Sequence, residues 1–319
     1  MRKPIPFIAL AALLLASACT LEGPSAADPD ALVYRAAFDG ETRGVVLHES
    51  GDEGHAGMFG TNCPFDTRTG GVTGDYDLPD QDEDVQDGEE TELGDITLTA
   101  TIPETGTVHV LDKTGGAYTH VPLALAGVTE GRLVRDGIVG LTGDCALHWI
   151  GFDGTTRATA SVEHCAGDVE VDPDRGVAFV ADTAGSVLTD GSTTVAAPVS
   201  GDLVAFDDVH RHFYVATSGG SSLAAVQADS TVRWSVEVPG RITALDDGGD
   251  TGSVAVVLEL DDRGNQGGDG GVAFFDGATG ERTLFARTPT AADDLAVSGN
   301  GRVLALVRPE QTFFYGLAD

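Results

Sequence analysis

Basic residues are scarce in this chain of 319 residues. Lysine and arginine number 18, against 51 aspartate and glutamate residues, so the formal net charge is −33. Such a surface repels phosphate groups, which excludes DNA and RNA as partners and argues against docking on anionic lipid by charge. The acidity supports solubility and does not indicate a fold.

Long apolar runs are almost absent. The one clear run, residues 5–16, has about a dozen residues, whereas a membrane-spanning helix needs roughly 20. It follows Arg2 and Lys3, as the apolar part of a secretory signal does. Residues 1–18 are therefore predicted to be a signal peptide and not part of the fold.

A cysteine stands where this apolar run ends. The segment LASAC (15–19) is similar to a bacterial lipoprotein box, in which the cysteine is lipidated and becomes the first mature residue. The resemblance implies lipidation at Cys19, and residues 19–30 are then a flexible tether to the membrane. Thr20 stands where inner-membrane lipoproteins often carry aspartate, which points to the outer membrane. The alternative is ordinary cleavage after Ala18 and a secreted or periplasmic protein.

Long helical periodicity is also missing, whereas short aliphatic runs recur between glycine and aspartate turns. Six candidate lead strands are spaced by 37, 36, 34, 39 and 53 residues, and removing a 12-residue insertion at 260–271 shortens the last step to 41. They are GDITLTA from Gly94, GRLVRDG from Gly131, GDVEVDPD from Gly167, GDLVAFDD from Gly201, GRITALDD from Gly240 and DDLAVSGN from Asp293. A repeat of this length built from short strands is typical of a β-propeller with about four strands per blade.

The spacing thus predicts an all-β fold, a β-propeller over residues 31–319. Six blades are favoured, and seven is the alternative because residues 31–93 are hard to assign to repeats. The last repeat, from DLAVS to TFFYGL, lacks a fourth strand. ALVYRAAF (31–38) could supply that strand and close the ring, which would remove an open sheet edge. The rival architecture is a pair of two-sheet sandwiches.

Two propeller families resemble these repeats. DVEVDPDRGVAFVADTAGSV and VSGNGRVLALV look like YVTN/lactonase-like repeats, and GGVAFFDGATGER and TVRWSVEVPG look like quinoprotein (PQQ-type) repeats. The lactonase-like resemblance implies a metal held in the central channel by acidic, amide and imidazole side chains. No such set can be assigned here, since Asp168, Asp202 and Asp294 open three lead strands as turn and capping residues do.

An acidic stretch interrupts the early part of the chain at about 66–93. Asp80, Asp82 and Asp84 have the spacing that opens a calcium-binding loop, because calcium prefers six to eight oxygen ligands. Val85 stands where such a loop needs glycine. We favour a solvated linker that binds no ion, with calcium binding as the alternative.

Cysteines are few outside the signal. Cys145 and Cys165 flank two predicted antiparallel strands and would lie at the same end of the hairpin, which predicts a disulfide. Cys63 is left without an assigned partner. A zinc site from these two cysteines with His148 and His164 is the weaker reading, because residues three apart on a strand point to opposite faces. The histidines of His210-Arg211-His212 are expected to face solvent in a turn.

The sequence therefore favours a lipid-anchored β-propeller of the bacterial cell envelope that binds a protein partner or acts as a scaffold, without catalysis or cofactor. One alternative is a lactonase-like or lyase-like enzyme with a metal in the channel. The other is a calcium-dependent surface or adhesion module built on the acidic stretch. Propellers present loops on a rigid ring, and loops carry most binding contacts.

Overall fold

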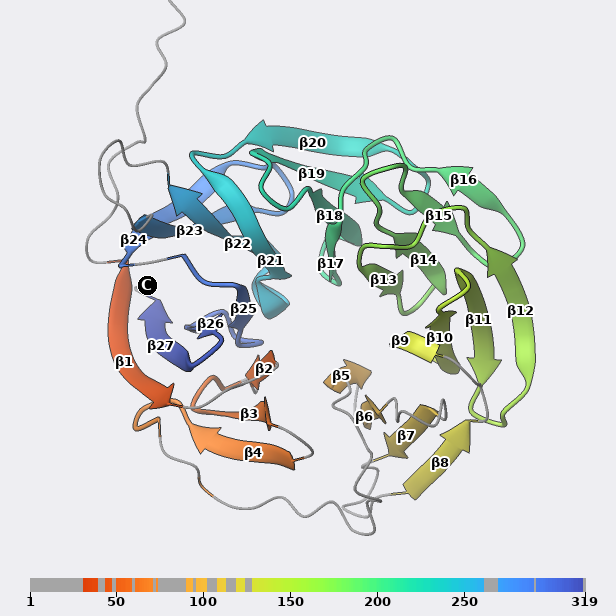
Figure 1. Ribbon diagram of the computed structural model, residues 1–319, viewed down its shortest axis with the longest axis horizontal. Coiled ribbons are helices and arrows are strands. Elements are labelled where there is room, and N and C mark those ends of the chain that lie inside the picture. Colours follow the sequence, from red (N-terminus) through yellow and green to blue (C-terminus); the bar gives the residue numbers. More distant parts are fainter. Residues whose placement is uncertain are drawn as a thin grey trace, which may run out of the picture.

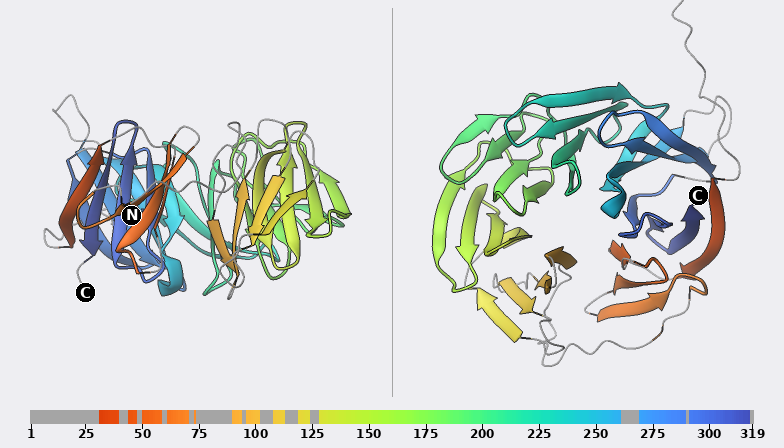
Figure 2. Two further views of the ribbon diagram at one scale, coloured as in Figure 1. Left: turned by 90° about the horizontal axis from the view of Figure 1, so that it is seen from below. Right: turned by 180° about the vertical axis from the view of Figure 1, so that it is seen from behind.

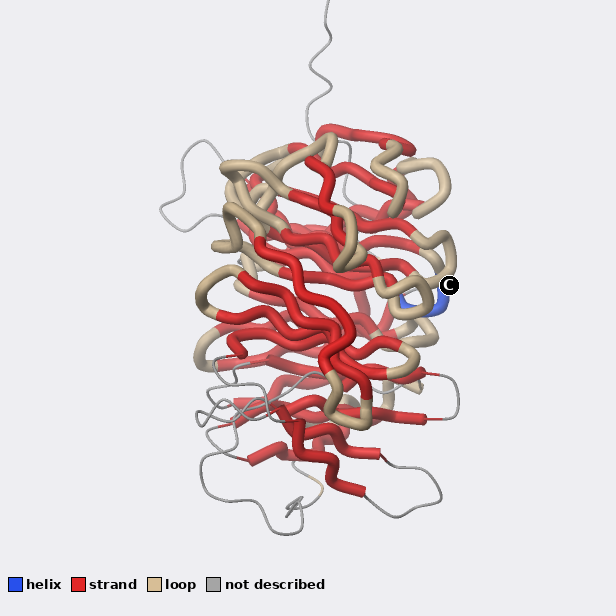
Figure 3. Tube along the Cα trace, turned by 90° about the vertical axis from the view of Figure 1, so that its right-hand side faces the viewer, coloured by secondary structure: helices blue, strands red, loops and turns tan. Residues whose placement is uncertain are grey.

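The computed structural model describes residues 31–39, 44–47, 50–58, 61–70, 73, 90–93, 96–101, 108–112, 119–123, 128–260, 269–289 and 291–317. Nearly all of this described chain is strand or turn, and the 3-10 helix η2 (Gly249–Thr251) is the exception (Figure 3). In the part described, no helix has the length and hydropathy needed to cross a bilayer.

The strands form six four-stranded sheets and one three-stranded sheet, all antiparallel. In chain order the sheets contain β2 (Gly44–Leu47), β3 (Glu53–Met58) and β4 (Thr61–Asp66); β5 (Glu90–Leu93), β6 (Ile96–Thr101), β7 (Val108–Asp112) and β8 (Thr119–Leu123); β9 (Val128–Val134), β10 (Gly137–Thr142), β11 (Ala146–Gly151) and β12 (Thr156–Ser161); β13 (Val169–Asp172), β14 (Val177–Val180), β15 (Val187–Thr189) and β16 (Thr194–Ala196); β17 (Leu203–Asp207), β18 (His212–Ala216), β19 (Ser222–Gln227) and β20 (Val232–Glu237); β21 (Arg241–Asp247), β22 (Ser253–Leu260), β23 (Asp269–Asp276) and β24 (Arg282–Thr288); and finally β25 (Asp294–Val297), β26 (Val303–Arg308), β27 (Gln311–Leu317) and β1 (Leu32–Asp39).

The sheets stand around a common centre, as in a β-propeller (Figures 1 and 2). The first strand of each sheet lies innermost, and the last strand lies on the perimeter (Figure 1). Consecutive strands pair through short turns, so each sheet is a meander. The turns that join first to second strands consequently gather on one face of the ring. The connections from one sheet to the next lie on the opposite face. The two-sandwich alternative is wrong.

The amino-terminal strand completes the last sheet, as predicted. β1 pairs antiparallel with β27 from Leu32 opposite Leu317 to Asp39 opposite Gln311. The sheet that ends the chain therefore takes its outermost strand from the beginning of the described chain (Figure 1). This arrangement ties the two ends of the ring together with backbone hydrogen bonds.

Five of the six predicted lead strands are innermost strands, namely those in β9, β13, β17, β21 and β25. The prediction for GDITLTA is wrong, because ITLTAT is β6, the second strand of its sheet, and β5 precedes it. β5 falls within the stretch predicted as an acidic loop. The repeat spacing favoured six blades, whereas the described residues fall into seven sheets, since residues 44–66 form a sheet with no recognisable repeat.

The core consists of layers between neighbouring sheets. One layer joins the sheets of β17–β20 and β21–β24 through Tyr214, Leu223, Val256 and Phe275, all buried. Second strands such as β10 and β18 are buried on both faces along their whole length. Burying one such Val, Leu or Phe side chain contributes about 1.5–3 kcal/mol, so the inter-sheet layers hold the turns in fixed positions.

Candidate functional site

A repeated aspartate turn shapes one face of the ring. Asp172 and Asp207 end the innermost strands β13 and β17, and both are buried. Each carboxylate accepts hydrogen bonds from backbone N–H groups two and three residues later, at 3.1 and 3.0 Å for Asp172 and at 2.7 and 3.2 Å for Asp207. Gly176 and Arg211 then adopt left-handed backbone with φ of 64° and 60°. The sequences DPDRG and DDVHR thus form the same Asx-type turn.

Asp207 organises a buried polar cluster. Its Oδ2 accepts a hydrogen bond from the Tyr214 hydroxyl at 2.5 Å and lies 2.8 Å from His210 Nδ1. The rings of His210 and His212 stack with centroids 5.9 Å apart. Burial, followed by the bond to Asp207, raises the pKa of Tyr214, and burial lowers the pKa of His212. The cluster therefore keeps Tyr214 as a neutral donor.

The same cluster joins two blades. Trp234 Nε1 on β20 donates to the Gly277 carbonyl in the turn after β23, at 2.8 Å. His212 Nδ1 lies 3.3 Å from the same carbonyl. Trp149 Nε1 on β11 similarly donates to the Gly176 carbonyl of the next sheet, at 2.7 Å. The expectation that both turn histidines face solvent is wrong for His212, which is 4% exposed, because this inter-blade contact encloses it.

The Asp172 turn in the preceding sheet lacks the tyrosine hydrogen bond that the Asp207 turn has. Asp172 Oδ2 is buried and accepts no hydrogen bond among the residues described. Phe179 occupies the strand position that Tyr214 holds beside Asp207, two residues beyond the partner of the aspartate. Asp172 Oδ1 instead binds the Arg211 guanidinium, which also binds Asp174 at 2.7 Å. The turn is thus held by ion pairs between sheets.

A second ionic cluster lies between β9 and β13. Arg132 Nε donates to Glu170 Oε1 and Arg132 Nη2 donates to Asp168 Oδ1, both at 3.0 Å. Asp168 Oδ1 also accepts from the N–H of Val169 at 2.8 Å. Arg132 is buried, so these bonds hold two innermost strands in register.

The other two lead-strand aspartates behave as capping residues, as expected. Asp202 Oδ1 accepts from the Ser218 N–H at 2.5 Å, and Asp294 Oδ1 accepts from the Leu295 N–H at 2.8 Å. Burial raises the pKa of Asp294, and the nearby carboxylate of Asp168 adds to that shift. These groups secure the starts of strands on the face opposite the Asp207 turn.

Two carboxylates at the end of β21 lie in an acidic environment. Asp246 Oδ2 accepts a hydrogen bond from the Val297 N–H of the neighbouring innermost strand at 2.9 Å. Burial and repulsion from Asp207 and Asp208 raise the pKa of Asp247 to about 7. Burial and repulsion from Asp247 likewise raise the pKa of Asp246. Both carboxyl groups therefore bind a proton more tightly than a free aspartate does.

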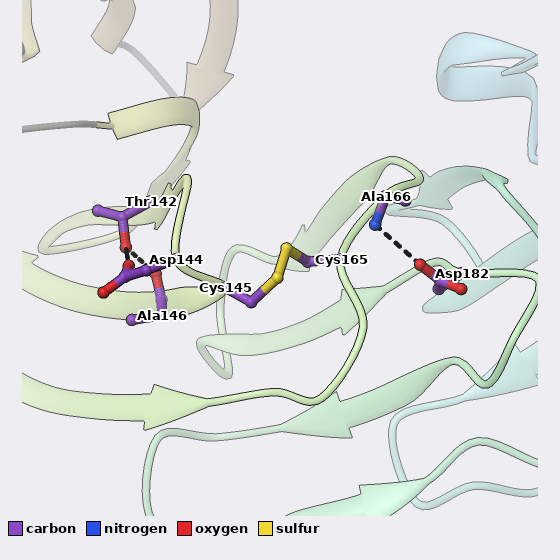
Figure 4. Close-up of a disulfide and its surroundings, with 7 residues drawn as sticks. All are labelled: Thr142, Asp144, Cys145, Ala146, Cys165, Ala166 and Asp182. Atoms are coloured by element: carbon purple, nitrogen blue, oxygen red, sulfur yellow. Dashed lines mark hydrogen bonds between the residues drawn. A yellow bond between two sulfur atoms is a disulfide. The ribbon is translucent and has the colours of Figure 1, made fainter.

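The predicted disulfide is confirmed. Cys145, in the turn between β10 and β11, is bonded to Cys165, in the connection from β12 to β13, with Cα atoms 5.6 Å apart (Figure 4). The Val162 N–H donates to the Cys145 carbonyl at 2.9 Å beside the bridge. The alternative zinc set is wrong, because both of its cysteines are used in this bond.

Several predicted site residues lie outside the described residues, namely Cys19, Asp80, Asp82 and Asp84. Cys63 lies in β4 opposite Ala56, and its side chain is also outside the description. Within the described ranges, no three His, Cys, Asp or Glu side chains converge as metal ligands would. Among the polar contacts described, those of Arg132 with Asp168, of Arg211 with Asp172 and of Trp234 with Gly277 join neighbouring sheets.

No family model matches the chain, and no curated protein matches it either. Solved structures do match: one chain in the crystal structure of a mitotic checkpoint complex is 12% identical, with a TM-score of 0.64 over 90% of this chain and 96% of that chain. At this identity the likeness shows the fold alone. Since 967 chains match, the fold by itself selects no function. The chain has a β-propeller-like fold.

Proposed function

We propose that this protein is a lipid-anchored β-propeller of the bacterial cell envelope that binds a partner protein and acts as a scaffold. The observation that carries the proposal is a ring of antiparallel sheets whose buried charges are used in joining blades. Arg132 joins the sheets of β9 and β13 in this way, and the buried Asp207 fixes the turn between β17 and β18. Rigid rings with loop-rich faces suit protein recognition. The similar chain comes from a mitotic checkpoint complex, so this fold is compatible with a place in a protein assembly.

The proposed ring has seven blades, one for each sheet of the described residues. The blade of β2–β4 has three described strands, and the last blade is completed by β1. In a closed ring of this kind the innermost strand edges face the channel, where they are protected from pairing with a neighbouring chain, which suits a protein held at high local density on a membrane.

The membrane attachment proposed here depends on Cys19. A cysteine that carries a diacylglycerol and an additional acyl chain anchors stably, whereas one chain alone binds only marginally. Thr20 favours the outer membrane as the place of residence. An envelope location also agrees with the disulfide, because disulfides persist outside the reducing cytoplasm.

The scaffold role is tested by cross-linking in intact cells, followed by capture of the detergent-solubilised protein. The captured partner must then form a complex of fixed stoichiometry with the purified propeller. Cys19→Ser is the matched control, since it removes the anchor and leaves residues 31–319 unchanged. We expect the wild type to be cross-linked to one envelope protein and the variant to lose the cross-link while still binding the purified partner. Absence of any stoichiometric complex would contradict the scaffold role.

A further inference from the structure

Exposed apolar side chains lie on several outermost strands of the described residues, and they are most exposed on β1. Among the described large hydrophobic side chains, the two most exposed are adjacent on β1: Val33 at 59% and Tyr34 at 58%. β1 is the outermost strand of its sheet (Figure 1). By contrast, the exposed positions of the outer strand β12 are occupied by threonine, arginine and serine.

The strand paired with β1 brings partly buried apolar side chains next to Tyr34. Leu32 and Leu317 face each other across β1 and β27, as do Tyr34 and Tyr315. The two tyrosine rings meet edge to face with centroids 6.0 Å apart, and Tyr315 is half-buried. Because side chains alternate along a strand, Val33 and Tyr34 stand on opposite faces of the sheet at its outer edge. Leu32, Tyr315 and Leu317 are partly buried against the core, so Val33 and Tyr34 are the exposed apolar groups of this edge. We call the edge formed by Val33, Tyr34 and Tyr315 the β1 patch. Tyr315 holds Tyr34 in place, so the patch is preformed and loses little conformational entropy on binding.

We propose that the β1 patch rests on the headgroup region of the bilayer to which Cys19 anchors the protein. This inference rests on the proposed lipid anchor. Thirteen backbone steps separate Cys19 from Leu32. At no more than about 3.6 Å per residue, the patch stays within about 47 Å of the anchored residue. No other strand is joined so directly to the lipid.

The chemistry of the patch fits this occupant. Tyrosine places an apolar ring and a polar hydroxyl at the boundary between lipid and water, where both parts are satisfied. The outer edge of β1 also carries unpaired backbone groups, which can bind water or headgroups there but not in hydrocarbon. The net charge of −33 repels anionic lipid, so the preferred surface is zwitterionic.

A weak contact between the β1 patch and the bilayer is sufficient to orient the ring. A short tether gives the patch an effective concentration on the order of millimolar at the membrane surface. Contact through the β1 patch would hold the ring with β1 toward the bilayer and β16, across the ring, away from it (Figure 1). The faces that carry the turns would then stand at the side, open to a partner.

The test places a fluorescent indole on each side of the ring. Tyr34→Trp reports on the β1 patch. Val195→Trp is the matched control, because Val195 lies on β16 with 41% of its side chain exposed. Each variant is made as the full lipidated chain and reconstituted in phosphatidylcholine vesicles with and without brominated acyl chains. Signal from Trp149 and Trp234, 8% and 9% exposed, is subtracted with the wild type.

The expected result is a loss of emission for Tyr34→Trp in brominated vesicles and equal emission for Val195→Trp in both vesicle types. Equal quenching of both variants, or of neither, would overturn the proposal. A blue shift of Tyr34→Trp without bromine quenching would show that a protein or a second copy covers the patch, and would overturn it too. If Tyr34→Trp melts below the wild type, Val33→Trp replaces it as the reporter.

Mass spectrometry of the same samples separates the two proposals. An acylated amino terminus together with unquenched Tyr34→Trp contradicts the membrane contact alone. An unacylated terminus removes the tether, and it contradicts the lipid anchor as well as this inference.

Discussion

The hydroxyl of Tyr214 stabilises the Asp207 turn, and its removal has a calculable cost. Both side chains are buried, at 0% and 1% exposure, so water cannot replace the 2.5 Å hydrogen bond between them. A hydrogen bond to a charged group contributes about 1.5–3 kcal/mol, and its loss leaves Asp207 Oδ2 with His210 Nδ1, 2.8 Å away, as its remaining side-chain partner. We therefore expect Tyr214→Phe to lower the free energy of unfolding by about 2 kcal/mol.

The reverse substitution, which adds a hydroxyl group, can be made in the sheet of β13–β16. Asp172 Oδ2 has no hydrogen-bond donor in the described structure, and Phe179 stands where a tyrosine would supply one. Phe179→Tyr should therefore raise stability, by about 1 kcal/mol at most, since the added oxygen also crowds a fully buried position. The two substitutions exchange the same hydroxyl at equivalent sites and are expected to act in opposite directions.

Thermal unfolding monitored by circular dichroism measures both effects. One kcal/mol corresponds to about 2–4 °C in a domain of 150–250 residues, and the shift per kcal/mol is smaller in a larger one. Tyr214→Phe should therefore lower the midpoint by about 4 °C. Tyr34→Phe is the control, because its exposed hydroxyl should contribute within about 0.5 kcal/mol. A midpoint for Tyr214→Phe equal to that of the control would refute this account of the turn.

Three further expectations concern other sites. Cys145→Ser with Cys165→Ser should cost about 3 kcal/mol, the entropy of a loop of about 20 residues, and should make the melting midpoint insensitive to reductant; an unchanged midpoint would contradict a stabilising bridge. The pKa of Asp247 is raised from 3.8 to about 7, so the folded chain binds the proton more tightly than the unfolded chain, and stability should fall as pH rises from about 4 to about 7. Asp247→Asn should flatten that part of a plot of melting midpoint against pH, and a parallel plot would argue against the shift. Calorimetric titration of the full chain with calcium should show no heat, whereas binding that Asp80→Asn with Asp82→Asn abolishes would establish an ion site in the acidic stretch.

Local features made much of the fold predictable. Glycine followed by aspartate or arginine marks the start of the innermost strands β13, β17 and β21 because the same turn chemistry recurs there, whereas the same signal at Gly94 precedes a second strand. The missing fourth strand of the last repeat correctly pointed to residues 31–38. The disulfide followed from hairpin register, since Cys145 and Cys165 must meet at one end of paired strands.

The polar clusters were less accessible to sequence reasoning. Trp234 and Gly277 are 43 residues apart, and their contact depends on how adjacent blades pack. His212 was expected to face solvent, because its burial depends on the same packing between blades. Tyr214, two positions later, was a signal that could have pointed to a buried cluster. β2–β4 carries no repeat signature, so its sheet could not be placed from spacing. Such contacts are set by closure of the ring, which no local pattern encodes.

The central claim is an envelope propeller held to its membrane by a lipid on Cys19. The most direct measurement is the intact mass of the protein purified in detergent from bacterial membranes. The account predicts a chain that begins at Cys19 and carries the mass of a diacylglycerol, and loss of both the added mass and the membrane association in Cys19→Ser. A wild-type chain that begins at residue 19 without lipid, or that keeps residues 1–18, would contradict it.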